Sequence, residues 1–204
     1  MLNELSKPGF SSESTSSELL RQLNASRPEA WNRFAELYTP LVYRWARKTS
    51  LQPADAEDVT QEVFRVIARR IPDYRTSHVK GGSFRGWMWG ITRNVILQHF
   101  ERHRKRDVPL GGSTAHRQLG EVPDLLRSDT PPPDPDGDKA LLMRVLRSIR
   151  NDFEESTWQS FWRTTVEGES ATDVGRDLAM TAAAVRQAKY RVLSRLREEL
   201  PDGD

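Results

Sequence analysis

The chain has 204 residues, of which 36% are hydrophobic and 29% charged, and its net charge is only +2. This length accommodates one domain or two small ones, and any nucleic-acid surface must come from local clustering of cations. There is no cysteine, which excludes disulfides and thiolate metal sites. No uninterrupted apolar run exceeds four residues, which excludes a membrane-spanning helix and a signal-peptide core.

The N-terminal part is predicted to begin as disordered chain and then to become helical. Residues 1–17 are rich in serine and bury little, which predicts disorder, and residues 18–24 can form a short helix. Ser26 and Pro28 indicate the start of the next helix, because serine caps a helix and proline fits its first turn. This helix carries a wide apolar stripe, and Pro40 is expected to kink or divide it.

An acidic row is predicted on the helix that opens at Pro53. Asp55, Asp58 and Glu62 follow one another at spacings of three and four residues, so they share one outer face, with Gln61 beside them. Paired carboxylates can serve acid–base catalysis, but no histidine or nucleophile accompanies them in the local sequence. A solvated face is therefore favoured over an active site.

The helix that opens at Pro53 is predicted to end at Pro72. Residues 72–83 are then predicted to form a loop, because they contain paired glycines and polar side chains. The groups in this loop that can stack on bases or bind phosphates are Tyr74, Arg75, His78 and Lys80. A plain connector is the alternative interpretation.

Residues 84–106 carry six arginines or lysines against one acid, together with four aromatic residues. Apolar residues recur at steps of three and four, and no glycine or proline follows Gly90, which predicts a helix. Cations beside flat aromatic side chains suit a phosphate backbone and unstacked bases. The alternative is an amphipathic core helix with a solvated basic end.

Residues 107–137 are predicted to be a flexible linker, because they contain six of the twelve prolines and four glycines, with little apolar periodicity. Fully extended, this segment reaches about 100 Å, which would let two modules bind separate DNA elements.

The C-terminal part, residues 138–204, predicts a helix-turn-helix. Helical patterns cover residues 138–149 and 156–167, and Ser170 with Asp173 forms a capping box for the following short helix. A short turn leads to Thr181, which is expected to cap the last helix. Two helices joined by so short a turn are typical of this motif.

The last helix is the predicted recognition helix, because residues 181–197 contain five cations and no acid. Its early turns are expected to meet base edges, and two later arginines to hold phosphates. The base-facing group is Thr181, Ala182, Ala183, Arg186, Gln187, Lys189 and Tyr190, and the phosphate-binding pair is Arg191 and Arg195.

Three stretches together resemble the extracytoplasmic-function (ECF) sigma factors of bacterial RNA polymerase, which belong to the sigma-70 family. The pattern F-R-x-W-[ML]-x-x-I-x-R-N, followed by a basic helix, is similar to the segment that melts and reads the minus-ten element. It is formed by Phe84, Arg85, Trp87, Met88, Ile91, Arg93 and Asn94. Residues 55–65, DAEDVTQEVFR, resemble the segment that docks on the clamp helices of the largest polymerase subunit.

The C-terminal part resembles the sigma domain that reads the minus-thirty-five element. Asp173, Val174 and Thr181 match its pattern, whereas Gly175 stands in place of the usual alanine and Ala179 in place of the usual glycine in the turn. These two departures leave the turn geometry open.

The resemblance implies an all-α fold with two small helical domains, residues 18–106 and 138–204, and a cytoplasmic location. It implies core RNA polymerase, through its clamp helices and flap, and promoter DNA as partners, and it leaves open whether an anti-sigma factor also binds. The implied docking residues are Asp55, Asp58, Gln61 and Glu62. The implied minus-ten residues are Tyr74, Arg75, His78, Lys80, Arg85, Trp87, Arg93, Asn94, His99, Arg102, Arg104 and Lys105.

Three other functions compete with this interpretation. A pure interaction protein would leave both basic helices unused. A stand-alone helix-turn-helix regulator would use neither the acidic row nor the aromatic-basic helix. A metal site or a hydrolytic enzyme is suggested by His99 and His103, which share a helix face at i, i+4. The sequence places no third ligand in an obvious position and has no H-E-x-x-H pattern. We therefore expect no metal, no cofactor and no catalytic residue.

Overall fold

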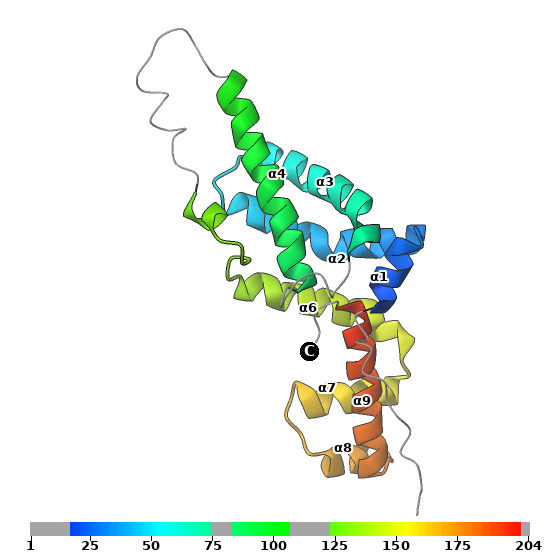
Figure 1. The fold of residues 1–204 in the computed structure, drawn as a ribbon. Coiled ribbons are helices and arrows are strands. Elements are labelled where there is room, and N and C mark those ends of the chain that lie inside the picture. The colour runs from blue at the N-terminus through cyan, green and yellow to red at the C-terminus, as the bar shows by residue number, and fades with distance from the viewer. Residues whose placement is uncertain (1–16, 75–82, 107–122, 201–204) are drawn as a thin grey trace, which may run out of the picture.

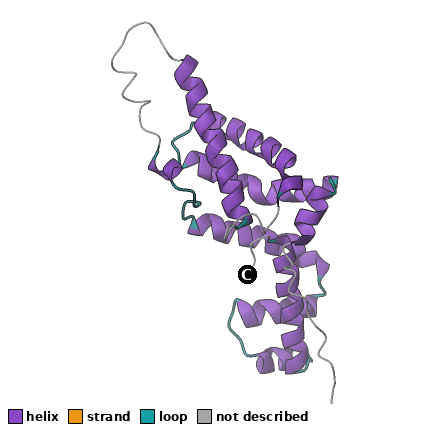
Figure 2. Cartoon of the chain, in the orientation of Figure 1, coloured by secondary structure: helices purple, strands orange, loops and turns teal. Residues whose placement is uncertain are grey.

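The computed structural model describes residues 17–74, 83–106 and 123–200, and all regular structure in these ranges is helical (Figure 1 and Figure 2). The predicted all-α class is confirmed. The α-helices are α1 (Ser17–Asn24), α2 (Pro28–Arg47), α3 (Pro53–Arg70), α4 (Phe84–Arg106), α6 (Pro135–Ile149), α7 (Glu155–Thr165), α8 (Ala171–Asp177) and α9 (Ala182–Glu199). Short 3-10 helices are η1 (Ile71–Asp73), η3 (Asp124–Arg127) and η4 (Arg150–Asp152). Among these helices, none is long and apolar enough to cross a membrane.

The N-terminal module is a bundle of α2, α3 and α4, which pack against one another through the predicted apolar stripes (Figure 1). Its core is aromatic: Phe34, Trp45 and Trp89 are fully buried, and the two tryptophan rings meet edge to face with centroids 5.5 Å apart. Such pairs add about 0.5–1.5 kcal/mol beyond the burial of apolar area. The aromatic residues near the start of α4 therefore contribute mainly to the hydrophobic core.

The start of α2 differs from the prediction. The N-cap residue is Arg27 and no side chain caps the helix, because Ser26 adopts a left-handed conformation with φ of 52°. The capping box predicted at Ser26 is wrong. Pro40 lies inside α2, which continues to Arg47 and is not divided.

The prediction of a flexible linker over residues 107–137 is wrong for the second part of this segment. Residues 107–122 lie outside the described ranges, but residues 123–137 are packed onto the N-terminal module. Leu126 is only 1% exposed, and the ring N–H of Trp89 donates to the carbonyl of Ser128 at 3.1 Å. The following helix begins at Pro135, three residues earlier than predicted.

Helix α6 joins the two predicted domains rather than beginning a separate one. It packs on α2, and α9 in turn contacts α1 and α6. One contiguous apolar cluster therefore includes Phe34 of α2, Val145 of α6 and Val192 of α9. The predicted boundary at residues 137–138 does not separate two independent cores.

The helix-turn-helix forms as predicted, and both of its caps are confirmed. The backbone N–H of Asp173 donates to Ser170 Oγ at 3.1 Å, and that of Ala184 donates to Thr181 Oγ1 at 3.1 Å. These bonds satisfy amides that would otherwise lack a partner at a helix start.

The two departures in the turn differ in their effect, since Ala179 is strained whereas Gly175 avoids a clash. Ala179 has a left-handed backbone with φ of 53°, a conformation that glycine adopts without strain. At Gly175 an added Cβ would lie 2.6 Å from the carbonyl oxygen of Met180. The glycine at position 175 thus lets the turn approach α8 closely.

Candidate protein-docking and nucleic-acid surfaces

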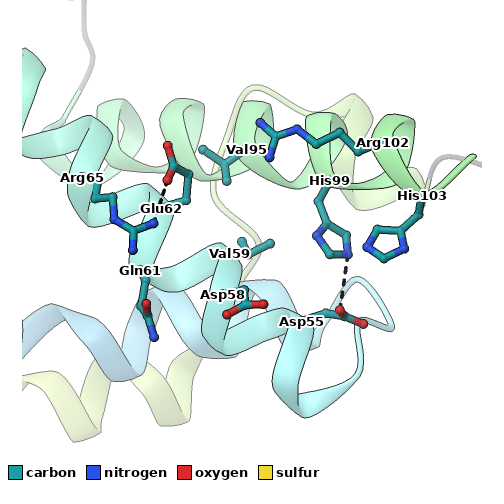
Figure 3. A pocket seen from close by; sticks show the side chains of 10 residues that line it. All are labelled: Asp55, Asp58, Val59, Gln61, Glu62, Arg65, Val95, His99, Arg102 and His103. Atoms are coloured by element: carbon teal, nitrogen blue, oxygen red, sulfur yellow. Dashed lines mark hydrogen bonds and ion pairs between the residues drawn. The ribbon is translucent and has the colours of Figure 1, made fainter. Parts of the chain in front are cut away.

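The four predicted docking residues line one open groove between α3 and α4 (Figure 3). The groove has a volume of about 400 Å³. Asp55, Asp58, Gln61 and Glu62 line it from α3, and Val95, His99, Arg102 and His103 line it from α4. The spacing of three and four residues brings the acidic side chains to one helix face, as the sequence predicts.

The carboxylates in this groove differ in how far the chain itself neutralises them. Glu62 forms ion pairs with Arg65 at 2.9 Å and with Arg69 at 3.6 Å. Asp58 is exposed, and its carboxylate has no hydrogen bond or ion pair to any residue that the structure describes. Asp58 is therefore the carboxylate most available to a basic partner.

A histidine pair closes one end of the groove. The rings of His99 and His103 lie 4.3 Å apart between centroids, and His99 Nε2 lies 3.7 Å from Asp55 Oδ1. Partial burial lowers the pKa of His99, and proximity to His103 lowers it further, against the opposing effect of Asp55. The resemblance assigns His99 to minus-ten DNA, but the structure places it on the same groove as the predicted docking residues. We call this groove the docking groove.

The remaining predicted minus-ten residues do not form one surface. Tyr74 and Trp87 come together, with ring centroids 4.8 Å apart, and both are partly exposed. Asn94 of α4 lines a second groove with Arg70 of α3 and Glu101 of α4. Arg102 lines the docking groove. The side chains of Arg75, His78, Lys80, Arg104 and Lys105 lie outside what the structure describes.

Two predicted DNA-binding arginines of α4 are engaged by residues far along the chain. Arg85 forms an ion pair with Asp138 and lies over the Trp45 ring at 5.6 Å from its centroid. Arg93 donates to the carbonyl of Leu126 and lies 3.6 Å from Asp129. Binding of DNA phosphates by either arginine would have to replace these contacts.

A buried carboxylate holds the same segment on α2. Asp134 is 4% exposed and accepts hydrogen bonds from Arg44 at 2.9 and 2.6 Å, with Lys48 Nζ 3.3 Å away. We call these three residues the Asp134 cluster. The hydrogen bonds from Arg44 lower the pKa of Asp134 from 3.8 to about 2.

The early turns of α9 present a different kind of surface. Arg186 and Gln187 are exposed, and neither side chain has a hydrogen bond or ion pair within the described ranges. Tyr190 is 56% exposed. Thr181 uses its hydroxyl as the cap, and Ala182, Ala183 and Lys189 lie on the same early turns.

The two arginines predicted to hold phosphates are already bonded within the chain. Arg191 donates to Thr157 Oγ1 at 3.2 Å. Arg195 pairs with Asp152 at 3.1 Å, with Glu198 at 3.4 Å and with Glu199. These acids compete with phosphate for Arg195.

The sequence analysis missed two groupings because both join distant segments. Asp134 and Arg44 are 90 positions apart, and Asp55 reaches His99 across two helices. The only local signal for the first was an aspartate before Pro135, a common helix start. No local signal marked the second.

Comparison with known proteins finds similarity to sigma factors. Residues 34–106 match the family model for sigma-70 region 2. The ECF RNA polymerase sigma factor BldN of Streptomyces coelicolor is 27% identical over 188 residues, which cover 91% of this chain and 66% of BldN. The ECF RNA polymerase sigma factor SigE of Mycolicibacterium smegmatis is 26% identical over 171 residues, which cover 84% of this chain and 62% of SigE.

The chain therefore spans less than two thirds of the length of either relative. Two solved structures also match at low similarity. A structure of the RsbN–BldN complex has 20% identity and a TM-score of 0.35, covering 87% of this chain and 96% of that one. A structure of CnrH in complex with the cytosolic domain of CnrY has 16% identity and a TM-score of 0.36, covering 89% and 94%.

Residues 34–106 are therefore similar to region 2 of the sigma-70 family. The two relatives that match over most of this chain are both ECF RNA polymerase sigma factors.

Proposed function

We propose that this chain is a transcription initiation factor that binds core RNA polymerase and directs it to specific promoters. In this role the groove face of α3 docks on a basic surface of the polymerase. The N-terminal module reads the minus-ten element, and α9 reads the minus-thirty-five element. The role is one of binding and positioning, and it requires no catalytic residue.

One observation carries the docking part of the proposal. Asp55, Asp58, Gln61 and Glu62 belong to a stretch similar to the sigma docking segment, and all four line one groove. A row of carboxylates steers and orients a basic surface, because complementary charge raises the rate of encounter and fixes the register.

Replacing Asp58 and Glu62 together by lysine tests this proposal. The double variant reverses the charge of the row at one exposed and one half-buried position, so we expect it to lose detectable binding to core polymerase while its helical circular dichroism stays unchanged. The matched control is Glu57→Lys, which reverses an exposed carboxylate of α3 that does not line the groove. Normal holoenzyme assembly by the double variant would contradict the docking surface.

A second test concerns DNA opening. Opening requires unstacking of bases, and the Tyr74–Trp87 pair is a small stacking surface to offset that cost. We expect permanganate-reactive thymines on a matched promoter only when this chain and core polymerase are both present. DNA melting by the chain alone would contradict the proposal that opening requires core polymerase.

A stand-alone helix-turn-helix regulator is the second candidate. The exposed early turns of α9 favour it, because they are available for DNA without polymerase. The two functions differ in one measurement: a stand-alone regulator binds its site equally well with and without core polymerase, and the Asp58/Glu62 double variant leaves that binding intact.

A further inference from the structure

Three potential metal ligands meet at the end of the docking groove. His99 and His103 project from consecutive turns of α4, and Asp55 faces them from α3 (Figure 3). One candidate ligand atom from each residue lies within 4.8 Å of the other two. His99 Nε2 and Asp55 Oδ1 lie 3.7 Å apart. Asp55 supplies the third ligand that the sequence did not place.

The chemistry of this set suits a borderline divalent cation. Two imidazoles and one carboxylate are a common first-row transition-metal donor set. Ligands at about 2.0–2.2 Å from one ion lie roughly 3–3.5 Å apart in a tetrahedral site, so these side chains would have to converge by about 1 Å. Histidines at i, i+4 on a helix can bind one ion together, because they share a face.

The surroundings leave room for an ion to enter and for a fourth ligand. All three side chains are partly exposed rather than buried, and the groove is open to solvent. Asp58 lines the same groove and adds negative charge. Arg102 is the nearby cation of the lining on α4, and its guanidinium extends away from the two histidines toward Val95 (Figure 3).

We propose that Asp55, His99 and His103 form a binding site for a divalent first-row transition-metal ion, with Zn²⁺ as the reference probe. A water molecule or Asp58 completes the coordination. The site is built from two helices that are held together by the core of the N-terminal module. Its geometry therefore depends on the folded module and not on a flexible segment.

The position of the site gives it a regulatory consequence, which rests on the docking function proposed above. Asp55 belongs to the predicted docking row, and a bound cation would neutralise its carboxylate and add positive charge beside Asp58. Docking on a basic partner would then weaken. By reciprocity, polymerase would lower the affinity for the ion by the same factor.

The site itself is tested without polymerase, by titrating Zn²⁺ into the tag-free full chain and by recording the visible spectrum with Co²⁺. We expect one saturable ion per chain and a Co²⁺ spectrum of low coordination number. Asp55→Asn, His99→Gln and His103→Gln should each lower the Zn²⁺ affinity by at least about tenfold. Far-UV circular dichroism checks that each variant is folded.

Two controls make the titration specific. Glu57→Gln removes an exposed carboxylate of α3 outside the groove, and the double variant His78→Gln/His116→Gln removes the other two histidines of the chain. Both should bind Zn²⁺ as the unaltered chain does. Absence of saturable binding, unchanged affinity in the folded His103→Gln variant, or dependence on His78 and His116 would each overturn the site.

The regulatory consequence is tested by measuring binding to core polymerase with saturating Zn²⁺ and with a chelator. We expect Zn²⁺ to weaken binding on the order of fivefold, and His103→Gln to abolish this zinc dependence. Normal binding with no response to Zn²⁺ would overturn the regulation. No binding even with the chelator would contradict the docking function, and the zinc titration would still decide the metal site.

Discussion

The early parts of α4 and α9 carry similar residues but differ in what those residues contact. In α4, Arg85 and Arg93 bind Asp138, Asp129 and the carbonyl of Leu126. In α9, Arg186 and Gln187 extend from the surface without such partners in the described chain. A cation on a helix therefore indicates a nucleic-acid surface only when no other segment of the chain competes for it.

This difference predicts that DNA binding has a different free-energy cost at α4 and at α9. If the N-terminal module reads the minus-ten element as proposed, it has to exchange intramolecular contacts for DNA contacts, whereas the early turns of α9 do not. Exposed ion pairs contribute only about 0–1 kcal/mol each, so the contacts of Arg85 and Arg93 are replaceable. The buried Asp134 cluster is stronger and holds the competing segment near them.

The largest expected effect concerns the Asp134 cluster. Replacing Asp134 by asparagine should lower the free energy of unfolding at neutral pH by about 2 kcal/mol, because a pKa lowered from 3.8 to about 2 corresponds to that stabilisation. Urea unfolding measures it. Asp136→Asn, an exposed carboxylate on the same helix turn, is the control and should change stability little.

The acid dependence of stability gives the same prediction a second readout. The folded pKa of Asp134 lies below its unfolded value, so the stabilisation is present above about pH 4 and is lost as the pH falls toward 2. The Asp134→Asn variant should lose less stability over this interval than the unaltered chain. Parallel acid profiles would show that Asp134 is not the group responsible.

The next largest effect compares two arginines of α9. Arg186→Ala should cost about 1–3 kcal/mol at particular base pairs of the minus-thirty-five element, because arginine can bond guanine with two hydrogen bonds. Arg195→Ala should mainly lower the melting temperature, because Arg195 pairs with Asp152, Glu198 and Glu199. Holoenzyme binding across a base-substitution panel and thermal unfolding separate the two results.

Other results for these two arginine variants would contradict the roles assigned to Arg186 and Arg195. If Arg195→Ala weakened binding to all sequences alike and reduced the salt dependence without lowering the melting temperature, the phosphate role predicted from sequence would stand. An even loss of affinity for every sequence in Arg186→Ala would remove that residue from base reading. Arg191→Ala is a useful third member, since its contact with Thr157 is a single hydrogen bond.

The features that could be predicted from the sequence are the local ones. The spacing of Asp55, Asp58 and Glu62 placed them on one face because a helix fixes that geometry within two turns. Ser170 and Thr181 could be predicted as caps for the same reason. The contacts of Asp134 and Leu126 could not, because the prolines and glycines around them describe only backbone preferences and not where the segment packs.

A smaller effect concerns the turn before the exposed α9 surface. Ala179→Gly should raise the free energy of unfolding by about 0.5–1 kcal/mol, because glycine relieves the left-handed backbone at some cost in unfolded-state entropy. Gly175→Ala should act in the opposite direction, since its Cβ would crowd the Met180 carbonyl. Thermal unfolding measures both, and equal signs for the pair would contradict the described turn.

The smallest expected effect tests whether acidic residues of the chain compete with DNA for the arginines of α4. Asp138→Asn removes the carboxylate that pairs with Arg85, whose side chain is 24% exposed against 48% for Asp138. The affinity of holoenzyme for a promoter fragment carrying only the minus-ten element should rise by less than about fivefold, because an exposed ion pair contributes at most about 1 kcal/mol. The gain should shrink as salt rises, since added ions screen the pair in the unaltered chain too.

Asp136→Asn again provides the matched control, because it removes the same charge from the same turn of α6 without removing the partner of Arg85. Equal gains in the two variants would mean that general charge, and not release of Arg85, raises the affinity. A loss of affinity in Asp138→Asn alone would mean that Asp138 holds Arg85 in the orientation that DNA requires. The Arg85–Asp138 ion pair would then preorganise the minus-ten surface. In that case the arginines of α4 and α9 would both be available to DNA, and they would differ only in how their side chains are held in position.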